Sequence, residues 1–367
     1  MDKKEILSGL EKIFDSGYVG LGPKTKEFEQ KFANYIGVRY AVALNSCTAA
    51  LHLACLSLGI KKGDEVIVPS MTFVSTALAP LYCEAKPVFA DIEKDTLCID
   101  LREIEKKITK KTRAIIVMHY GGHACKMDEV LKLAKKHGIC VIEDAAHACG
   151  AKYKNKKLGS IGKMGCFSFH AVKNLPTGDG GMITTNDKKL YEKLLKLRWV
   201  GIDKSTWQRS YQKKYSWHYS VDELGFKYHM NDITAVIGIA QLKVLDKHNL
   251  IRRKLAKMYD KAFENKKWIE IPVEKNYVFS SRHNYVIKVG QRDKLNRYLA
   301  SRGISSGVHY EPVHRYKVFN GTKSTLAVTE KVWKNLLTLP LFPDLKKEEL
   351  ERIAKEVLKF GEINNLS

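Results

Sequence analysis

The sequence predicts an α/β protein with a large domain, built on a mostly parallel sheet flanked by helices, and a smaller C-terminal α+β domain. Short apolar runs alternate with stretches of helical period over the first two thirds of the chain, and the pattern changes near Asn231. Strands that alternate with helices pair in parallel, because each helix returns the chain to the same edge of the sheet. The 367 residues are also long for one compact core, which favours two domains.

The first helix is predicted over residues 25–37, where Phe28, Phe32 and Tyr35 recur at helical spacing and Gly37 ends the run. A second helix is predicted over TAALHLACLSLGI. Seven short apolar runs predict the strands, at residues 40–45, 64–69, 86–92, 113–120, 138–144, 166–170 and 181–186. We therefore expect a single seven-stranded sheet with helices on its faces.

A long helical pattern begins near Asn231, with Asn231 or Asp232 as its cap. Strand signals at WIEIP and HNYVIKV follow, then a helix near RDKLNRYLASRG and another from about Lys346. We place the large domain at residues 1–245 and the small α+β domain at residues 246–367, with the long helix as the connector.

The charge balance is strongly basic, with 63 Lys and Arg against 40 Asp and Glu and a net charge of +23. Such a balance suits nucleic acid, a membrane surface or an acidic small substrate. The lysines are scattered over helix faces, which favours an ordinary solvated surface, and no nucleic-acid motif accompanies them. Residues 198–223 are aromatic and basic without a clear period, and a loop of that length is often functional.

Eight cysteines with no CxxC pair predict reduced thiols and no metal cluster. His119 and His123 could be read as metal ligands, but without a second matching pair we expect a structural or cofactor-side role. The N-terminus is charged and lacks the apolar core of a signal peptide, and no apolar run approaches the roughly 18 residues that span a bilayer. We expect a cytoplasmic protein without membrane, nucleic-acid or metal partners.

Two stretches predict polar groups at the carboxyl edge of the sheet. Asp144 ends the apolar run CVIED, so its carboxylate lies where ligands bind to α/β sheets, unless it only caps a helix. In NSCTAALHLA a helix begins directly after a strand, so backbone N–H groups near Thr48 and Ala49 can hold an anion. An ordinary capping turn is the alternative reading of this second stretch.

Lys173 stands in FHAVKNLPTGDGG, 29 positions after Asp144 and five after Ser168. A lysine beside a buried strand must be exposed, paired or chemically engaged. Pyridoxal phosphate would need an anion site, a carboxylate at its ring nitrogen and a lysine at its aldehyde, and these residues supply all three. Phe73, in PSMTFVSTALAP, could stack on such a ring or pack in the core.

The ordered set NSCTAALHLA, PSMTFVSTALAP, VIEDAAHACGAKYK, GCFSFHAVKNLPTGDGGMITTN and LGFKYHMNDITAVIGIAQL closely resembles the DegT/DnrJ/StrS family of sugar aminotransferases. The resemblance extends from GLGPKTKEFEQKFANYIG to LPLFPDL, and five motifs in order make it specific. It implies the type I fold of pyridoxal phosphate enzymes and a homodimer with shared active sites. It also implies amino transfer, usually from L-glutamate, to a keto-sugar that is usually nucleotide-linked.

Carried over position by position, the resemblance implies that Lys173 is the Schiff-base lysine and Asp144 the partner of the pyridine nitrogen. It implies that His147 lies beside the cofactor oxygen and that Phe73 stacks on the ring. The implied phosphate contacts are Thr48, Ala49 and Ser168.

Two positions depart from the family pattern. Many members have an asparagine that reaches the cofactor phosphate of the neighbouring subunit, and this chain has Lys227 there. A lysine could also bind a phosphate. The usual GEGG reads GDGG, with glycines at 178, 180 and 181 that we expect to let the chain turn sharply beside Lys173.

Amino transfer is favoured over a related dehydration, because the dehydratase branch of the family has histidine where Lys173 stands. His170 lies three residues earlier and matches the family's SFH, so it does not replace the lysine. His309 and Tyr310 match a stretch near the family's substrate, and a buried strand with a satisfied histidine is the alternative.

The expected activity is that of a pyridoxal phosphate aminotransferase acting on a nucleotide-linked 4-keto or 3-keto deoxysugar for surface-polysaccharide biosynthesis, with L-glutamate as the donor. The alternatives are the same chemistry on a keto-sugar acid such as an octulosonate, an aminocyclitol precursor or a small phosphorylated ketone. A cofactor-binding regulator and a dehydratase that uses pyridoxamine phosphate also remain open.

Overall fold

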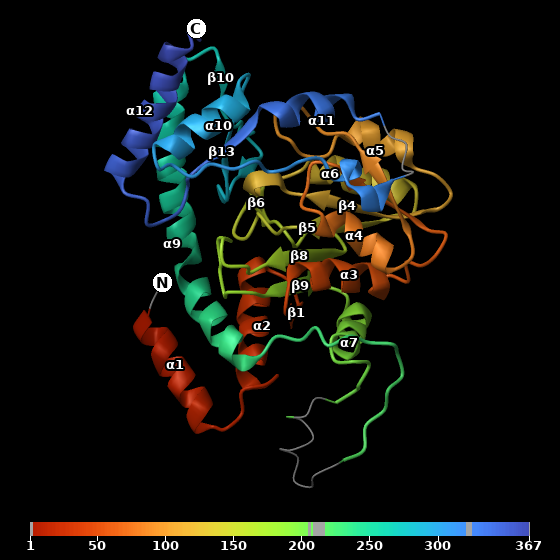
Figure 1. The fold of residues 1–367 in the computed structure, drawn as a ribbon. Coiled ribbons are helices and arrows are strands. Elements are labelled where there is room, and N and C mark those ends of the chain that lie inside the picture. Colours follow the sequence, from red (N-terminus) through yellow and green to blue (C-terminus); the bar gives the residue numbers. More distant parts are fainter. Residues whose placement is uncertain (1–2, 205–206, 208–216, 321–324, 367) are drawn as a thin grey trace.

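The computed structural model describes residues 3–204, 207, 217–320 and 325–366. One large sheet crosses the molecule, and helices cover both of its faces (Figure 1). A smaller group of helices and strands adjoins it along the long helix α9 (Asp232–Phe263).

The central sheet has seven strands in the order β1, β9, β8, β5, β4, β2 and β3. Their bounds are β1 (Tyr40–Leu44), β2 (Glu65–Pro69), β3 (Lys86–Ala90), β4 (Thr112–Met118), β5 (Cys140–Asp144), β8 (Met164–Ser168) and β9 (Gly181–Thr185). Strand β9 is antiparallel to both of its neighbours, and all other pairs are parallel. This confirms the predicted mostly parallel sheet and its seven strands.

The sheet separates two apolar cores, because successive side chains of a strand point to opposite faces. In β4, Ile115 and Val117 belong to one core and Ala114 and Ile116 to the other. The first core is closed by α2 (Pro23–Ile36), α5 (Leu101–Lys107), α6 (Met127–Lys136) and the beginning of α9. The second core is closed by α3 (Cys47–Ser57), α4 (Ser75–Tyr82) and α7 (Lys188–Leu197). Burial on both faces explains why these strands read as continuous apolar runs.

Helix α9 begins where the sequence predicts. The side chain of Asn231 caps it by accepting the Thr234 amide at 2.9 Å. The buried carboxylate of Asp232 accepts the Gly22 amide at 3.0 Å and both the amide and the hydroxyl of Thr25. One carboxylate therefore joins the beginning of α9 to the beginning of α2.

The C-terminal part builds a third core from the second half of α9, the antiparallel sheet of β10 (Ile269–Glu270), β12 (Tyr285–Val289) and β13 (Leu336–Leu339), and the helices α10 (Arg292–Ser301) and α12 (Lys347–Ile363). The division predicted at residue 245 lies inside α9, where Leu245 packs in the first core and Leu255 in the third. Val313, Phe319 and Leu326 return to the second core. The domain division remains a prediction.

The remaining elements are α1 (Lys3–Asp15), α11 (Ala327–Val332), β6 (Lys152–Tyr153), β7 (Lys156–Lys157), β11 (Val278–Phe279), and the 3-10 turns η1 (Tyr120–Gly122), η2 (Val313–Arg315), η3 (Lys317–Phe319) and η4 (Trp333–Asn335). Within the described ranges, no helix has the length and apolar character that a bilayer crossing requires. The eight cysteines are free, and seven of them are buried.

Candidate active site

The predicted site residues gather along the carboxyl edge of the central sheet, because they follow strands that run in the same direction. Asp144 and Ser168 are the last residues of β5 and β8. Thr48 follows β1, Phe73 follows β2, and Lys173 lies in the connection from β8 to β9. Ligands bind to α/β sheets at this edge.

Asp144 is buried and hydrogen-bonded through both carboxylate oxygens. Thr76 Oγ1 donates to Oδ2 at 2.6 Å, and the amide of Ala146 donates to Oδ1 at 3.1 Å. Burial raises the pKa of Asp144, while these two hydrogen bonds and the nearby charge of Lys173 oppose the shift. The site therefore presents a carboxylate that gains stability from a positive partner.

Lys173 lies within the electrostatic field of Asp144. Burial lowers the pKa of the Lys173 ammonium, while Cys47 and the Asp144 carboxylate oppose that shift. The charge of Lys173 in turn helps to lower the pKa of His147 and of His309. An amine with a lowered pKa is neutral more often at neutral pH, and the neutral form is the nucleophile.

The glycines after Lys173 act differently from one another. Gly178 has a φ of +93°, the left-handed conformation expected of a sharp turn. Gly180 and Gly181 have no positive φ, so the prediction that all three turn the chain was wrong for these two. Gly181 is required for space instead, because a Cβ there would lie 2.3 Å from the carbonyl oxygen of Ser46.

The beginning of α3 lies beside this turn, and its backbone is partly occupied. Ser46 caps the helix by accepting the Ala49 amide at 3.0 Å, and Thr48 Oγ1 lies 2.7 Å from Ser75 Oγ. Ser168 is buried opposite Gly181 in the sheet, so it lies close to the same helix end. The hydroxyls of Thr48, Ser75 and Ser168 and a helix N-terminus suit an anion, and Ser75 is a member that the sequence did not suggest.

Phe73, His147 and Tyr310 form an aromatic group beside Asp144. Tyr310 Oη lies 2.8 Å from His147 Nε2, and the Phe73 and Tyr310 ring centroids are 6.0 Å apart. Burial and the Asp144 charge raise the pKa of Tyr310. Phe73 is 55% exposed, which excludes the alternative of core packing.

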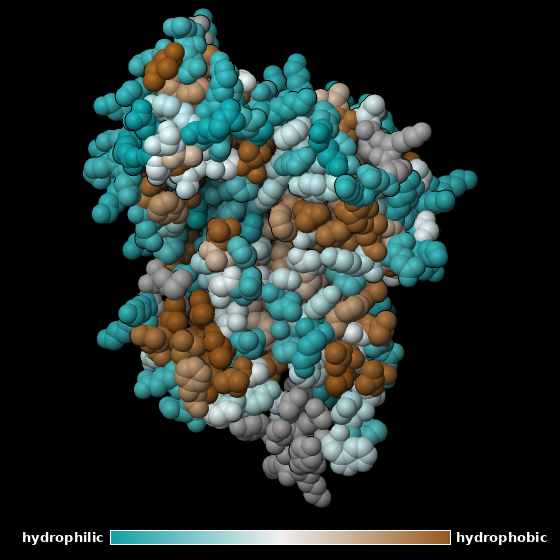
Figure 2. Space-filling view, in the orientation of Figure 1, coloured by the Kyte–Doolittle hydropathy of each residue, from teal (hydrophilic) through white to brown (hydrophobic). Residues whose placement is uncertain are grey.

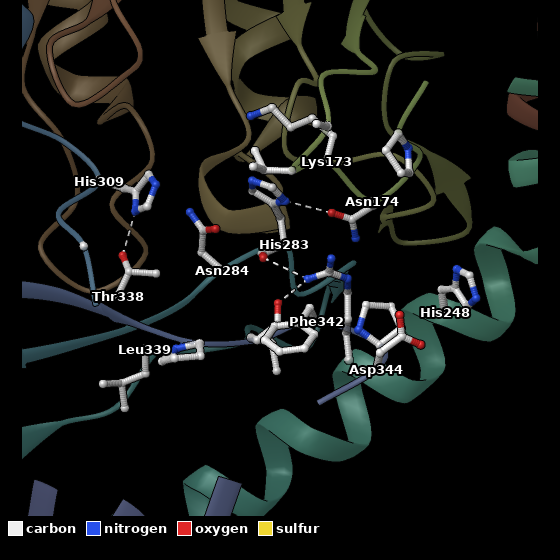
Figure 3. Close-up of a pocket in the computed structure, with 18 of the residues that line it drawn as sticks. Lys173, Asn174, His248, His283, Asn284, His309, Thr338, Leu339, Phe342 and Asp344 are labelled. Atoms are coloured by element: carbon white, nitrogen blue, oxygen red, sulfur yellow. Dashed lines mark hydrogen bonds between the residues drawn. The ribbon is translucent and has the colours of Figure 1, made fainter. Parts of the chain in front are cut away.

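The adjacent His309 and Tyr310 line two different cavities, although their ring centroids are only 5.0 Å apart. His309 lines the cavity that also contains Lys173 and bonds through Nδ1 to Thr338 Oγ1 at 2.8 Å (Figure 3). Burial, with the charge of Lys173, lowers the pKa of His309 to about 4. Neither residue belongs to a strand, so the alternative of a buried strand is wrong.

The backbone of Lys227 lies beside the end of β1, where its carbonyl accepts from Asn45 Nδ2 at 3.4 Å, but its side chain is directed to Trp199. Its ammonium lies 3.5 Å from the ring centroid of Trp199, in a cation–π contact. A role at a partner's cofactor remains a prediction. The predicted loop at residues 198–223 lies partly outside the described residues, and its two ends and Trp207, whose ring centroid lies 4.9 Å from that of Tyr18, can be placed.

His119 and His123 have structural partners. His119 Nε2 lies 3.0 Å from the buried carboxylate of Glu143, which also accepts the backbone amides of residues 159, 161 and 162. His123 Nδ1 lies 2.9 Å from the Ala124 carbonyl oxygen. Across the described ranges, no group of three or more His, Cys, Asp and Glu side chains could hold a metal ion.

His283 is a site residue that the sequence did not suggest. Its ring lies 4.3 Å from the His147 ring and is buried, and its Nδ1 lies 2.9 Å from Asn174 Oδ1 (Figure 3). The Asn174 amide nitrogen donates to Asn249 Oδ1 at 2.7 Å and to the Ser281 carbonyl at 3.0 Å, so Asn174 Oδ1 must be the acceptor. A lone histidine before a strand, 110 residues after Lys173, carries no sequence signal for this contact.

The hydrogen bond to Asn174 fixes the tautomer of His283. Its Nδ1 carries the proton, and burial lowers the pKa of the ring well below its ordinary value, so Nε2 keeps a lone pair. In Figure 3 the ring lies below the side chain of Lys173, on the wall of the same cavity. His283 is therefore a fixed hydrogen-bond acceptor next to the lysine.

The buried histidines predict a loss of stability in mild acid. Burial lowers the pKa of His147 and His283 in the folded protein, while the unfolded chain titrates near 6.5. Below pH 6.5 the unfolded chain takes up protons that the folded protein does not, so stability is complete above pH 6.5 and declines as the pH falls. Each histidine contributes a slope of up to about 1.4 kcal/mol per pH unit. Urea unfolding of the cofactor-free protein at pH 7 and pH 5.5 measures this slope, and equal slopes for the native protein and His283→Gln would contradict it.

The residues present suit pyridoxal phosphate. A buried carboxylate and an amine each shift the pKa of the other, the aromatic residue Phe73 is exposed, and a helix N-terminus with the hydroxyls of Thr48 and Ser75 lies beside them. These groups match the pyridine nitrogen, the aldehyde, the ring and the phosphate in charge and chemistry. The side chain of Lys227 is engaged with Trp199 instead.

Comparison with known proteins agrees with this geometry. Residues 1–358 match the DegT/DnrJ/EryC1/StrS aminotransferase family. The spore coat polysaccharide biosynthesis protein SpsC of Bacillus subtilis is 38% identical over 96% of this chain and 94% of its own length.

Two solved structures share the fold. One is Spr1654 of Streptococcus pneumoniae, described as a sugar aminotransferase, in its pyridoxamine phosphate form. It has a TM-score of 0.92 at 30% identity and covers 99% of this chain and 98% of its own. The pyridoxal phosphate form of Spr1654 is also similar, with a TM-score of 0.91. Helicobacter pylori PseC, an aminotransferase of pseudoaminic acid biosynthesis, has a TM-score of 0.91 at 30% identity, covering 99% and 97%.

The fold and the site together define a type I pyridoxal phosphate enzyme. The chain belongs to the DegT/DnrJ/EryC1/StrS aminotransferase family and is a pyridoxal phosphate-dependent aminotransferase.

Proposed function

We propose that this enzyme acts in the cytoplasm and transfers an amino group from L-glutamate to a keto-sugar. The proposed keto-sugar is a nucleotide-linked 4-keto or 3-keto deoxysugar. The observation that carries the proposal is that Lys173 and Asp144 lie near enough at the carboxyl edge of the sheet for the charge of each to shift the pKa of the other. The sugar acceptor is supported by relatives named for polysaccharide and pseudoaminic acid biosynthesis. Surface-polysaccharide biosynthesis is the corresponding proposed role.

The cofactor would be held by residues of four kinds. Lys173 would bind its aldehyde, Asp144 its ring nitrogen, Phe73 its ring face and His147 its ring oxygen. The hydroxyls of Thr48 and Ser168 and the α3 backbone near Ala49 would bind its phosphate. When bound, pyridoxal phosphate supplies an electron sink for the bond broken at the substrate carbon.

Each protein group has a defined task in this proposal. Asp144 holds a proton on the ring nitrogen, because a buried carboxylate stabilises a positive partner. Lys173 moves a proton at the substrate carbon, and its lowered pKa favours the neutral amine that can accept it. His309 and Tyr310 would contact the substrate from two surfaces of the same site.

A homodimer is part of the proposal and is supported by exposed apolar side chains. Leu7 and Phe14 of α1 are 54% and 60% exposed, and apolar side chains gather over α1 on the face seen in Figure 2. Phe73, beside the site, is 55% exposed, and Leu224, near the end of the 198–223 segment, is 87% exposed. Large apolar surface on a soluble protein marks an interface.

Absorbance and mass measurements test the proposal on the purified protein. We expect a yellow protein whose absorbance shifts when L-glutamate is added and whose bound cofactor is fixed to Lys173 by borohydride. A keto-sugar should then reverse the shift, and sedimentation should give twice the mass of one chain. No shift with any amino acid would favour the dehydratase or the regulator, and reversal only by a keto-sugar acid, a cyclitol ketone or a phosphorylated ketone would change the acceptor.

A further inference from the structure

A cavity of about 540 Å³ adjoins Lys173 and reaches into the C-terminal part of the molecule. Its walls are the connection that carries Lys173, one face of α9, and segments 305–309 and 338–344 (Figure 3). Gln241, His248 and Arg252 of α9 line it, seven and four residues apart, so they share one helix face.

Arg252 is a buried cation that pairs with no carboxylate of the described residues. Its side chain is 5% exposed, and its guanidinium donates from Nη1 to two backbone carbonyls, of Leu341 at 2.6 Å and of His283 at 3.3 Å. Its Nε has no hydrogen-bond partner among the described residues. Burial lowers the pKa of Arg252 to about 10, so the guanidinium remains charged at neutral pH.

The other two buried arginines of the described chain each have a carboxylate. Arg198 pairs with Glu29, and Arg292 pairs with Asp293 at 2.6 Å. An unpaired buried charge is costly, and a planar guanidinium binds a carboxylate with two parallel hydrogen bonds. Arg252 is therefore the buried arginine of the described chain that no carboxylate of the protein neutralises.

The remaining cavity residues leave room for an anion. Asp344 is the sole acidic side chain on the wall, and its charge raises the pKa of His248, whose net pKa is lowered by burial. Asn284 Nδ2 and Gln241 Oε1 are buried without partners on the same wall, so Asn284 offers another donor and Gln241 another acceptor. Buried polar atoms normally have partners, which indicates a polar ligand that carries both acceptors and N–H groups.

We propose that Arg252 binds the carboxylate of the amino-acid donor in this cavity, with the donor's amine directed to Lys173. The inference rests on the proposed function, because it assigns a site to the donor of that reaction. An amino acid carries both kinds of group, since its carboxylate can accept from Arg252 and Asn284 while its amine is the N–H group that reaches Lys173. The competing explanation is that Arg252 only ties two carbonyls together.

Three variants separate the two explanations. Arg252→Met removes the positive charge and keeps much of the side-chain length. Arg252→Lys keeps the positive charge but cannot make the two parallel hydrogen bonds of a guanidinium. Arg253→Met is the matched control, because Arg253 is the next residue and already binds Glu274 at 2.8 Å. Thermal unfolding of all three reports any loss of structure.

Binding of glutarate, a dicarboxylate that has no amine and cannot react, is measured by calorimetry on the holoenzyme. We expect glutarate to bind the native enzyme and Arg253→Met alike, about 10- to 100-fold more weakly to Arg252→Met, and with partial recovery in Arg252→Lys. Equal glutarate affinity for the native enzyme and Arg252→Met would overturn the inference.

The two half-reactions give the second readout. The L-glutamate concentration for half-maximal reduction of the cofactor absorbance should rise about 10- to 100-fold in Arg252→Met, while the pyridoxamine form should still react with the keto acceptor at the native rate. Equal losses in both half-reactions, with a lower melting temperature, would show a purely structural arginine. If the native enzyme responds to no amino acid, the proposed function fails, and the glutarate titration still decides the role of Arg252.

Discussion

Lys173→Ala is expected to lose turnover by about 10⁵-fold or more, because the variant lacks both the amine that binds the aldehyde and the base that moves the proton. Its polypeptide should fold normally, since Lys173 is a loop residue whose backbone amide, bonded to the His170 carbonyl at 2.9 Å, is retained. Steady-state amino transfer measures the loss. The variant should still bind pyridoxamine phosphate non-covalently, through the phosphate and ring contacts.

The control for this variant is Lys163→Ala, which removes a lysine that pairs with Asp187 on the surface at 2.8 Å. It should keep native turnover and the yellow colour. A small primary amine added to Lys173→Ala should restore part of the activity, because it supplies the missing base from solution. Turnover by Lys173→Ala within tenfold of the native rate would remove the mechanism.

Asp144→Asn is the second change with a large expected effect, a loss of about 10³-fold in the reaction with L-glutamate. The amide has nearly the same shape as the carboxylate, but it carries no charge to hold a proton on the ring nitrogen. Thr76 and the Ala146 amide each donate to one oxygen of the Asp144 carboxylate. Because the asparagine has one oxygen and one NH2 group, one of these two donors would lose its acceptor. Stopped-flow absorbance of the donor half-reaction measures the effect.

Thr76→Val separates the charge from the hydrogen bond. It removes the 2.6 Å bond to Asp144 and keeps the carboxylate, so a loss of no more than about tenfold is expected. In the cofactor-free protein, Asp144→Asn should also lower the pKa of Lys173 further, because the Asp144 charge raises it. The pH dependence of lysine acylation reports this shift. An Asp144→Asn enzyme as fast as Thr76→Val would show that the charge of Asp144 is not used.

The sheet could be predicted from the sequence because a strand that is buried on both faces is a continuous run of apolar residues. All seven apolar runs became strands of the central sheet, and Asn231 caps α9 as its side chain and position suggested. No sequence pattern marks the predicted boundary at residue 245, since α9 is one continuous helix there and its two halves pack in different cores. Helical period reports that a helix exists and not which core each turn joins.

The glycines show a similar limit. A run of glycines indicates that side chains are excluded, but not whether the reason is backbone conformation or space. Gly178 requires the left-handed conformation, whereas Gly181 is required because the α3 end approaches it. Only the packing of two distant segments distinguishes these reasons.

By itself, the sequence determined the strand pattern, the positions of Lys173 and Asp144 after strands of one direction, and the motifs shared with a family. The tertiary structure decided which groups surround that pair: Thr76 on the carboxylate, His283 held in one tautomer by Asn174, and Arg252 buried without an anion. The physical reason is the distance along the sequence between the residues that interact. Period and burial are encoded in neighbouring residues, whereas a pKa, a tautomer or an unpaired charge depends on side chains brought together from segments a hundred residues apart.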